Sequence, residues 1–290
     1  AMVKLSNALD LITLPDGAGK PMIMEVSMDM LPVIYASVDY DGKDIFKYNH
    51  AEQKEFCKKV QMIFQNPYSS LNPRMTVKDI VGEGLKQHGM STKDADAKVE
   101  QLLATVGLNK DHMSRFPHEF SGGQRQRIGI ARALSVDPEF IICDEPISAL
   151  DVSIQAQVIN MLKELQEERG LTYLFIAHDL SVVKYISDRV VVMYLGTMVE
   201  TAETDELYAH PMHPYTQALL SAIPEADPNK AKANQRIPIK GEIPSPINPK
   251  NCCRFAERCQ HATERCFKEM PQMKEIAPGH KVACHLVEDK

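Results

Sequence analysis

FPHEFSGGQRQRIGIARALSVDPEFIICDEPISALD, residues 116–151, is the stretch that decides the fold, and it holds two patterns directed at phosphate. The first is the turn Ser121-Gly122-Gly123-Gln124, which opens a predicted helix whose apolar face is Ile128, Ala131 and Leu134. The N–H groups and the positive dipole end at a helix start suit a polyphosphate. Two glycines let the backbone approach such a ligand closely. The turn therefore predicts a phosphate-facing helix start.

The second pattern is the apolar run Phe140–Cys143, which ends in Asp144 and Glu145. Four apolar residues followed by two acids are typical of a buried parallel strand, and Pro146 would end it. In open α/β sheets, ligands bind at the carboxyl edge of the strands, where these two carboxylates would emerge. The sequence thus predicts an α/β fold with a ligand site at the edge of its sheet.

Three further motifs stand in order around these two. Gln65 follows a strand predicted over 60–64, Ser148-Ala149-Leu150-Asp151 follows the two acids, and His178 follows a strand predicted over 173–177. In this order, the five motifs resemble the Q-loop, signature, Walker B, D-loop and switch histidine of ABC transporter ATP-binding subunits. Five ordered motifs rarely match by chance. The resemblance covers roughly residues 40 to 290.

The resemblance implies a P-loop NTPase (RecA-like) core of the ABC type, with an inserted helical subdomain at about 74–136. In such a core, Asp144 would hold Mg²⁺ through water and Glu145 would polarise the attacking water. His178 would contact the γ-phosphate and that water. The uncharged amide of Gln65 would reach both Mg²⁺ and the water.

The resemblance also implies a head-to-tail dimer with two nucleotides between its subunits. Each nucleotide site would join the phosphate loop, Walker B acids and histidine of one subunit to the signature of the other. Ser121-Gly122-Gly123-Gln124 would then bind ATP held by the partner, and Asp151 would cross the dimer interface.

The phosphate loop of the family, G-x-x-x-x-G-K-[ST], is matched only in part by LPDGAGKP at 14–21. Gly19 and Lys20 fit and would bind ATP. Leu14 stands at the first glycine position, and Pro21 replaces the hydroxyl that would hold Mg²⁺. Two interpretations stay open: a degenerate loop in the correct register, or a truncated or disrupted start that is no phosphate loop and leaves no intact Walker A.

Three segments point to one branch of the family. His213–Leu220 reads HPYTQALL, Asn66–Met75 reads NPYSSLNPRM, and Ile243–Pro246 reads IPSP. All three resemble oligopeptide/dipeptide importers, and the chain resembles their second (F) ATP-binding subunit. The cofactors implied are ATP and Mg²⁺. The partners implied are a second ATP-binding subunit in a hetero- or homodimer, two transmembrane permease subunits and, indirectly, an extracytoplasmic peptide-binding protein.

Composition sets modest bounds on location and partners. The 290 residues allow one large domain or two, and 44% apolar residues support an ordinary globular core. A net charge of −6 argues against nucleic acid as a partner. No apolar run is long enough to span a bilayer, and nothing at the start resembles a secretory signal. We therefore expect a cytoplasmic chain, peripheral on the inner face of the cell membrane through its partners.

We expect an ABC ATPase domain over 1–223 and a Pro-rich linker with a Cys-containing extension over 224–290. Six prolines in 224–250 predict an extended linker rather than packed structure. Four of the seven cysteines are spaced C-x5-C-x6-C-x17-C, at Cys253, Cys259, Cys266 and Cys284. In a cytosolic chain, clustered cysteines favour a metal over a disulfide. Four thiolates can hold an iron–sulfur cluster, and the resemblance favours [4Fe–4S]. Zinc and free thiols stay open as alternatives, although the short C-x2-C spacing of common zinc sites is absent.

The principal hypothesis is an ATPase that energises oligopeptide or dipeptide import through ATP binding and hydrolysis at a dimer interface. One alternative is a catalytically silent subunit that supplies the signature to a partner ATPase, because its own phosphate loop is degenerate. The other is a soluble ABC ATPase without a transport role. The HPYTQALL pattern, the cysteine tail and the acidic balance argue against that last alternative.

Overall fold

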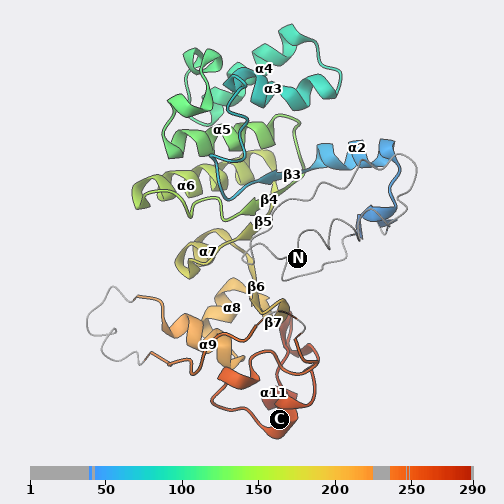
Figure 1. Cartoon of the computed structure of the whole chain (residues 1–290), viewed down its shortest axis with the longest axis vertical. Coiled ribbons are helices and arrows are strands. Elements are labelled where there is room, and N and C mark those ends of the chain that lie inside the picture. Colours follow the sequence, from blue (N-terminus) through green and yellow to red (C-terminus); the bar gives the residue numbers. More distant parts are fainter. Residues whose placement is uncertain (1–38, 41–42, 225–235, 246, 248, 289–290) are drawn as a thin grey trace, which may run out of the picture. The chain divides into compact units, whose positions relative to one another are not determined.

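The computed structural model describes residues 39–40, 43–224, 236–245, 247 and 249–288 (Figure 1). The partial phosphate loop, with Leu14, Gly19, Lys20 and Pro21, lies outside these ranges, so both interpretations of it stay open. Within the described ranges, no helix is both long enough and apolar enough to cross a membrane.

Three parallel strands form the first sheet. In spatial order they are β3 (Val60–Ile63), β4 (Phe140–Asp144) and β5 (Thr172–Ile176). The prediction of a buried parallel strand is confirmed, since Ile141 and Cys143 of the central strand β4 are fully buried. Parallel neighbours end at the same edge of a sheet. Gln65, Glu145 and His178 all follow strands of this sheet, so they emerge at that common edge.

The longer helices pack with this sheet around one hydrophobic core. They are α3 (Val77–Gln87), α4 (Thr92–Thr105), α5 (Gly122–Leu134) and α6 (Val152–Arg169). α3, α4 and α5 pack against one another, and α5 also packs against β3. Thr76, Ser91 and Ser121 begin three of these helices, each accepting a backbone N–H at the N-cap. Gly107, with a φ of 73°, follows α4 and ends it as its sequence position predicts.

Several short helices, strands and 3-10 turns connect the longer elements. The short helices and strands are α2 (His50–Lys59), α7 (Leu180–Ile186), β1 (Asp39–Tyr40) and β2 (Lys43–Asp44). The 3-10 turns are η2 (Ile45–Lys47), η3 (Lys110–Ser114), η4 (Pro117–Glu119), η5 (Ala256–Arg258) and η6 (Glu264–Phe267). Of these, η4 leads directly into the N-cap of α5 and therefore places the Gly-rich turn.

A second sheet, which is antiparallel, joins a hairpin at residues 189–203 to the C-terminal tail. In spatial order its strands are β6 (Arg189–Tyr194), β7 (Thr197–Glu203), β9 (His280–Val282) and β8 (Lys274–Ala277). Leu195 and Gly196 form the hairpin turn, both at positive φ, which matches the twist of the strands. The domain boundary at 223/224 stays a prediction. β7 and β9 lie on opposite sides of it and pair directly.

The remaining helices are α8 (Thr204–Ala209), α9 (Pro214–Ser221) and α11 (His285–Glu288). Of these, α8 and α9 contribute to a second hydrophobic core beside this sheet. His213 is the N-cap of α9, and its Nδ1 accepts the N–H of Tyr215 at 3.1 Å. The Tyr215 ring packs edge-on against Tyr194, with ring centroids 4.7 Å apart. The HPYTQALL pattern therefore forms a Pro-broken turn and a short helix, as its sequence predicts.

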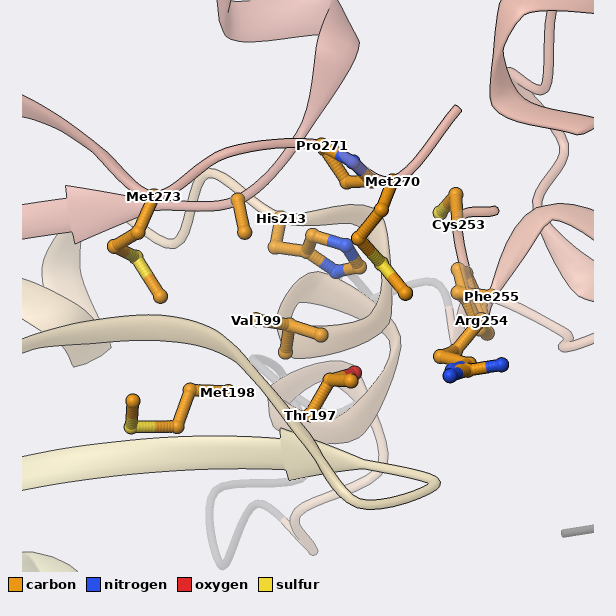
Figure 2. A pocket seen from close by; sticks show the side chains of 11 residues that line it. Thr197, Met198, Val199, His213, Cys253, Arg254, Phe255, Met270, Pro271 and Met273 are labelled. Carbon is orange, nitrogen blue, oxygen red and sulfur yellow. The ribbon is translucent and has the colours of Figure 1, made fainter. Parts of the chain in front are cut away.

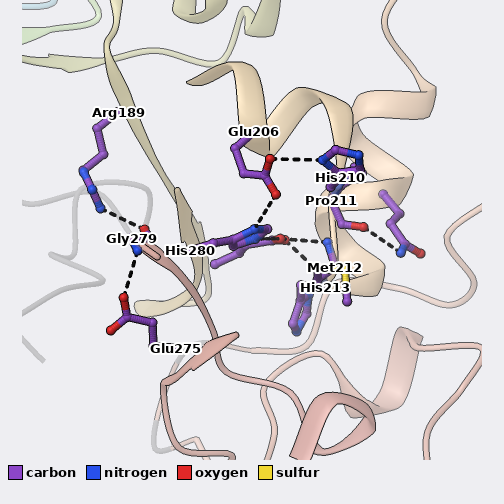
Figure 3. Close-up of polar contacts among 11 residues, drawn as sticks. Arg189, Glu206, His210, Pro211, Met212, His213, Glu275, Gly279 and His280 are labelled. Atoms are coloured by element: carbon purple, nitrogen blue, oxygen red, sulfur yellow. Dashed lines mark hydrogen bonds and ion pairs between the residues drawn. The ribbon is translucent and has the colours of Figure 1, made fainter. Parts of the chain in front are cut away.

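A buried polar network ties the tail to β7 (Figure 3). The fully buried carboxylate of Glu200 accepts the N–H groups of Met212 at 2.7 Å and His213 at 3.0 Å. One of its oxygens also lies 2.8 Å from Nε2 of His280. On the other side of that ring, Nδ1 of His280 lies 3.4 Å from Glu206, which in turn contacts His210. Both oxygens of the buried Glu200 carboxylate thus have hydrogen-bond partners, as burial requires.

The described residues between 236 and 250 contain no helix or strand, in agreement with the predicted extended linker. Most of the described residues in this segment are exposed, but the tail contacts it at several points. Gln260 donates to the carbonyl of Pro238 at 2.8 Å, and Arg258 donates to that of Lys240 at 3.3 Å. Ile239 packs against the second core. Side chains of the tail supply the hydrogen bonds that a Pro-rich backbone cannot make to itself.

Candidate active site

Glu145 lies between two other residues of the predicted catalytic set. The Gln65 amide donates to Glu145 Oε2 at 2.8 Å, and His178 Nδ1 lies 3.6 Å from Glu145 Oε1. The His178 side chain is 73% exposed, so most of the ring faces solvent. The structure therefore brings the three side chains together at the edge of the parallel sheet. Their predicted catalytic roles remain to be tested.

The backbone at Glu145 adopts the left-handed region, with a φ of 41°. Its N–H donates to the carbonyl of Ile176 at 3.0 Å, and its carbonyl accepts from both the N–H and the hydroxyl of Ser148. A left-handed non-glycine residue costs roughly 1–3 kcal/mol and persists only where its surroundings enforce it. Here the strained turn points the carboxylate at Gln65 and His178.

Asp144 lies beside Glu145 at the end of β4. Burial, followed by the negative charge of Glu145, raises the pKa of Asp144. A cation at this edge would relieve that repulsion and favour the ionised carboxylate. The described residues contain no group of three or more His, Cys, Asp or Glu side chains arranged around a metal.

The predicted signature turn forms the start of α5. Ser121 accepts the N–H of Gln124 at 3.4 Å, and the Gln124 side chain accepts the N–H of Ser121 at 3.1 Å, which completes a capping box. A Cβ at Gly123 would lie only 2.6 Å from Cγ2 of Ile154, whereas one at Gly122 meets Leu150 at an ordinary 3.8 Å. Close packing of α5 on α6 therefore already requires glycine at 123, a reason that the sequence does not show.

Asp151 is exposed and is the N-cap of α6, but its side chain makes no cap hydrogen bond. Its carbonyl instead accepts the N–H groups of Ile154 and Gln155. The carboxylate is therefore available to a partner, as the D-loop prediction requires. Beside it, Gln155 donates to the carbonyl of Ile147 at 3.0 Å and lines a cavity of about 40 Å³ with Glu145 and His178. That space is enough for a water. Sequence analysis did not identify Gln155 as a neighbour of this site.

The four tail cysteines lie near one another without forming a disulfide. Burial raises the pKa of Cys253 and of Cys259, and raises that of Cys284 to about 11. The charges of the other three thiols add to the rise of the Cys284 pKa, so all four lie within electrostatic range. The predicted iron–sulfur or zinc site is not assembled, since the described residues hold no metal-binding group. Without a metal, the raised pKa values keep the thiols of Cys253, Cys259 and Cys284 protonated at neutral pH.

A cavity of about 230 Å³ opens between β7 and the tail (Figure 2). Its lining is mostly apolar and rich in sulfur, including Met198, Met270, Met273 and Cys253. The ring of His213 lies among these side chains. Burial lowers the pKa of His213 to about 4, so the ring is neutral. Because Nδ1 accepts from Tyr215, the remaining proton lies on Nε2.

Comparison with known proteins places this site in a family. A family model described as "ABC transporter" matches residues 12–148, and one described as "Oligopeptide/dipeptide transporter, C-terminal region" matches 199–266. The oligopeptide transport ATP-binding protein AppF of Bacillus subtilis is 52% identical over 272 residues, which cover 93% of this chain and 83% of AppF. The chain belongs to the family of oligopeptide ABC transporter ATP-binding proteins. OppF of Streptococcus mutans is 53% identical over 268 residues, 92% of this chain and 80% of OppF.

Solved structures of ABC proteins share the fold. CbiO1 from Clostridium perfringens matches 59% of this chain and 67% of its own, with a TM-score of 0.53 and 26% identity. The ADP- and phosphate-bound ATP-binding cassette MJ0796 matches 57% of this chain and 72% of its own, with a TM-score of 0.51 and 27% identity. The predicted ABC ATPase P-loop fold is thus confirmed, and so is the resemblance to the oligopeptide transporter family.

Proposed function

We propose that this protein is the ATP-binding subunit that energises peptide import by an ABC transporter, and that it hydrolyses ATP at a dimer interface. The observation that carries the proposal is the contact of Glu145 with Gln65 and its proximity to His178, in a chain that belongs to this family. The comparisons give no support to a silent subunit or to a non-transport ATPase.

In this proposal Glu145 polarises the attacking water. The amide of Gln65 donates to one carboxylate oxygen of Glu145 and leaves the other on the side of His178. The cavity between Glu145, Ser148 and His178 has room for that water. His178 is mostly exposed and can turn toward a γ-phosphate. Such positioned general-base catalysis contributes on the order of 10²–10⁴ in rate.

The cofactor in this proposal is Mg²⁺, which would neutralise phosphate charge during transfer. Asp144 would hold it through water and Gln65 through its amide oxygen. The raised pKa of Asp144, caused by burial and by the charge of Glu145, supports a cation at this edge. Gly19 and Lys20 would bind the phosphates of ATP from the part of the chain outside the described residues.

The family implies a dimeric ATPase with membrane permease partners. We propose that Ser121-Gly122-Gly123-Gln124 contacts the nucleotide bound by the second ATP-binding subunit. The unbonded side chain of Asp151 would cross toward that subunit. Attachment to two permeases would place the chain on the inner face of the membrane. An extracytoplasmic binding protein would deliver the peptide.

A [4Fe–4S] cluster or zinc bound by Cys253, Cys259, Cys266 and Cys284 stays a hypothesis. The effect of Cys253, Cys259 and Cys266 on the pKa of Cys284 places the four thiols near one another and supports it, whereas the described residues show no assembled ligand group. We therefore assign no step to a metal in the tail. Metal analysis and visible absorption of anaerobically purified protein would separate cluster, zinc and free thiols.

Hydrolysis by the purified transporter tests the proposal. Glu145→Gln should keep ATP binding and lower kcat about 10²–10⁴-fold, because only the general base is lost. The matched control is Glu168→Gln, the same change at an exposed position on α6. Full turnover by Glu145→Gln, or a wild-type transporter whose hydrolysis comes wholly from the other subunit, would overturn the proposal.

A further inference from the structure

Arg125 on α5 carries a buried guanidinium beside the signature turn. The residue is only 8% exposed. Its Nε donates to the carbonyl of Pro117 at 2.7 Å, and its Nη2 donates to that of His118 at 3.3 Å. Both carbonyls belong to η4, the turn that leads into Ser121. The position of this turn is therefore set by the guanidinium of Arg125.

The same guanidinium stacks on a second segment. Cζ of Arg125 lies 3.9 Å from the centroid of the Tyr68 ring, within cation–π range. Tyr68 lies three residues after Gln65 in a tight turn, in which Asn66 Oδ1 accepts the N–H groups of Tyr68 at 2.9 Å and Ser69 at 3.4 Å. A short, hydrogen-bonded segment thus connects Gln65 to the Tyr68 ring, so a shift of Gln65 would also move that ring.

Arg132 fixes the far end of that turn to the same helix. Its Nη1 donates to the carbonyl of Ser70 at 2.6 Å, and its Cζ lies 5.4 Å from the Phe64 ring. Arg127 makes different contacts: it donates to the carbonyl of Val106 and to Gln157. α5 therefore holds the segment that follows Gln65 through two arginines, while the third ties α5 to other helices.

Nη1 of Arg125 is buried and has no hydrogen-bond partner among the described residues. A buried donor without a partner costs roughly 1–3 kcal/mol. A second arrangement of η4 or of the Tyr68 turn that offered Nη1 an acceptor would recover that free energy. In the arrangement seen here, Nε and Nη2 hold η4 while the face of the guanidinium lies on the Tyr68 ring.

We propose that Arg125 is a positioning residue, which links the Gln65 loop of this subunit's own nucleotide site to the signature turn offered to its partner's nucleotide. The path runs from Glu145 to Gln65, through the turn at Asn66 to Tyr68, and across the stacked guanidinium to η4. This inference rests on the proposed function, because it needs the roles given there to Gln65 and to Ser121.

The test is ATP hydrolysis by the whole purified transporter with changes on each side of the stack. Tyr68→Leu removes the aromatic face and should lower kcat about 2- to 30-fold, the range of a cation–π contact, with no change in the equilibrium affinity for ATP. The ATP dependence should also become less cooperative. Tyr68→Phe keeps the face and should restore both kcat and cooperativity.

Changes at the arginine separate this role from docking to a permease. Tyr68 is 62% exposed, whereas Arg125 is only 8% exposed, so Arg125→Gln changes much less of the exposed surface than Tyr68→Leu does. It should also lower kcat and cooperativity, and the double variant Tyr68→Leu/Arg125→Gln should lose no more than the Arg125→Gln single variant. Arg127→Gln is the matched control, because it removes a tether of α5 that does not reach the Gln65 loop. It should keep wild-type cooperativity.

Two results would overturn the inference: equal kcat in Tyr68→Leu and wild type, or equal losses in Tyr68→Leu and Tyr68→Phe. Additive losses in the double variant would count against it as well. Glu145→Gln in the same preparation distinguishes the two proposals. If that variant is inactive while Tyr68→Leu behaves as wild type, the inference fails and the proposed function stands. If Glu145→Gln hydrolyses ATP at the normal rate, the proposed function fails, and the inference that rests on it fails with it.

Discussion

Glu200 and His280 lie 80 residues apart in the chain, yet Oε1 of Glu200 and Nε2 of His280 are 2.8 Å apart and both side chains are fully buried. The same carboxylate accepts two backbone N–H groups of the turn that contains His213. One glutamate thus holds together the hairpin, the HPYTQALL turn and the C-terminal strand. In this chain, that carboxylate therefore joins β7 to both the turn before α9 and the strand β9.

Glu200→Gln should lower the free energy of unfolding by about 3 kcal/mol. Glutamine has one acceptor oxygen, so its NH₂ group would face a buried N–H donor and leave it unpaired. Urea unfolding followed by circular dichroism measures the change. His210→Ala, at the exposed end of the same network, should stay within about 0.5 kcal/mol of the wild type. Equal effects of the two changes would show that the network does not hold the tail.

Stability should fall as pH drops through the range set by His213. Burial lowers the pKa of His213 to about 4, so the unfolded chain gains a proton below about pH 6.5 while the folded chain does not. The contribution of His213 to the free energy of unfolding is therefore fully present above about pH 6.5 and is lost as the pH falls toward 4. The loss is on the order of 3 kcal/mol.

His213→Asn provides the comparison for this pH dependence. Asparagine keeps an acceptor for the N-cap of α9 but does not titrate. The difference in unfolding free energy between wild type and variant should therefore shrink or reverse as pH falls from 6.5 to 4. Parallel curves for the two proteins would contradict the assignment.

Gly123→Ala should destabilise the protein by about 1–3 kcal/mol, because the new methyl group would meet Cγ2 of Ile154 at 2.6 Å. Gly122→Ala, whose methyl group has ordinary space beside Leu150, is the matched control and should be nearly neutral. The double variant Gly123→Ala/Ile154→Ala should lose less stability than the sum of the losses in the two single variants. Thermal unfolding of the four variants measures these differences.

Cys284 should resist alkylation near neutral pH. Burial raises the pKa of the Cys284 thiol to about 11, so at pH 8 only about one molecule in a thousand carries the reactive thiolate. The iodoacetamide rate at Cys284, followed by peptide mass spectrometry, should rise about tenfold per pH unit from 8 to 10. Exposed Cys57 serves as the internal reference. A plateau near pH 9 would contradict the raised pKa, and protection at every pH until chelation would indicate a bound metal.

The order of motifs predicted the parallel sheet and the three residues at its edge, because strand-end positions fix which side chains meet. The helix at Ser121 followed from its cap and its apolar spacing. The helix pattern is local in the sequence, and the meeting of the strand-end residues follows from the shared direction of parallel strands. They made Glu145, Gln65 and His178 recognisable before any contact was known.

Other features depended on contacts between distant segments and were not visible in the sequence. The left-handed backbone at Glu145 follows from its hydrogen bond to Ile176. Gly123 is needed because Ile154 packs against it. The predicted extended linker is contacted by Gln260 and Arg258. The hydrophobic pattern of residues 274–282 did not predict the two short strands that extend the hairpin sheet there.

The pairing of β9 with β7 also has a consequence during synthesis. A ribosome that adds about 5–20 residues per second needs roughly 4–16 seconds to pass from Glu200 to His280. During that interval β7 presents an unpaired strand edge, and the carboxylate of Glu200 lacks its imidazole. An open edge of this kind invites pairing with another nascent chain. The tail therefore covers an edge of the hairpin that stays open until the last strands of the chain have been made.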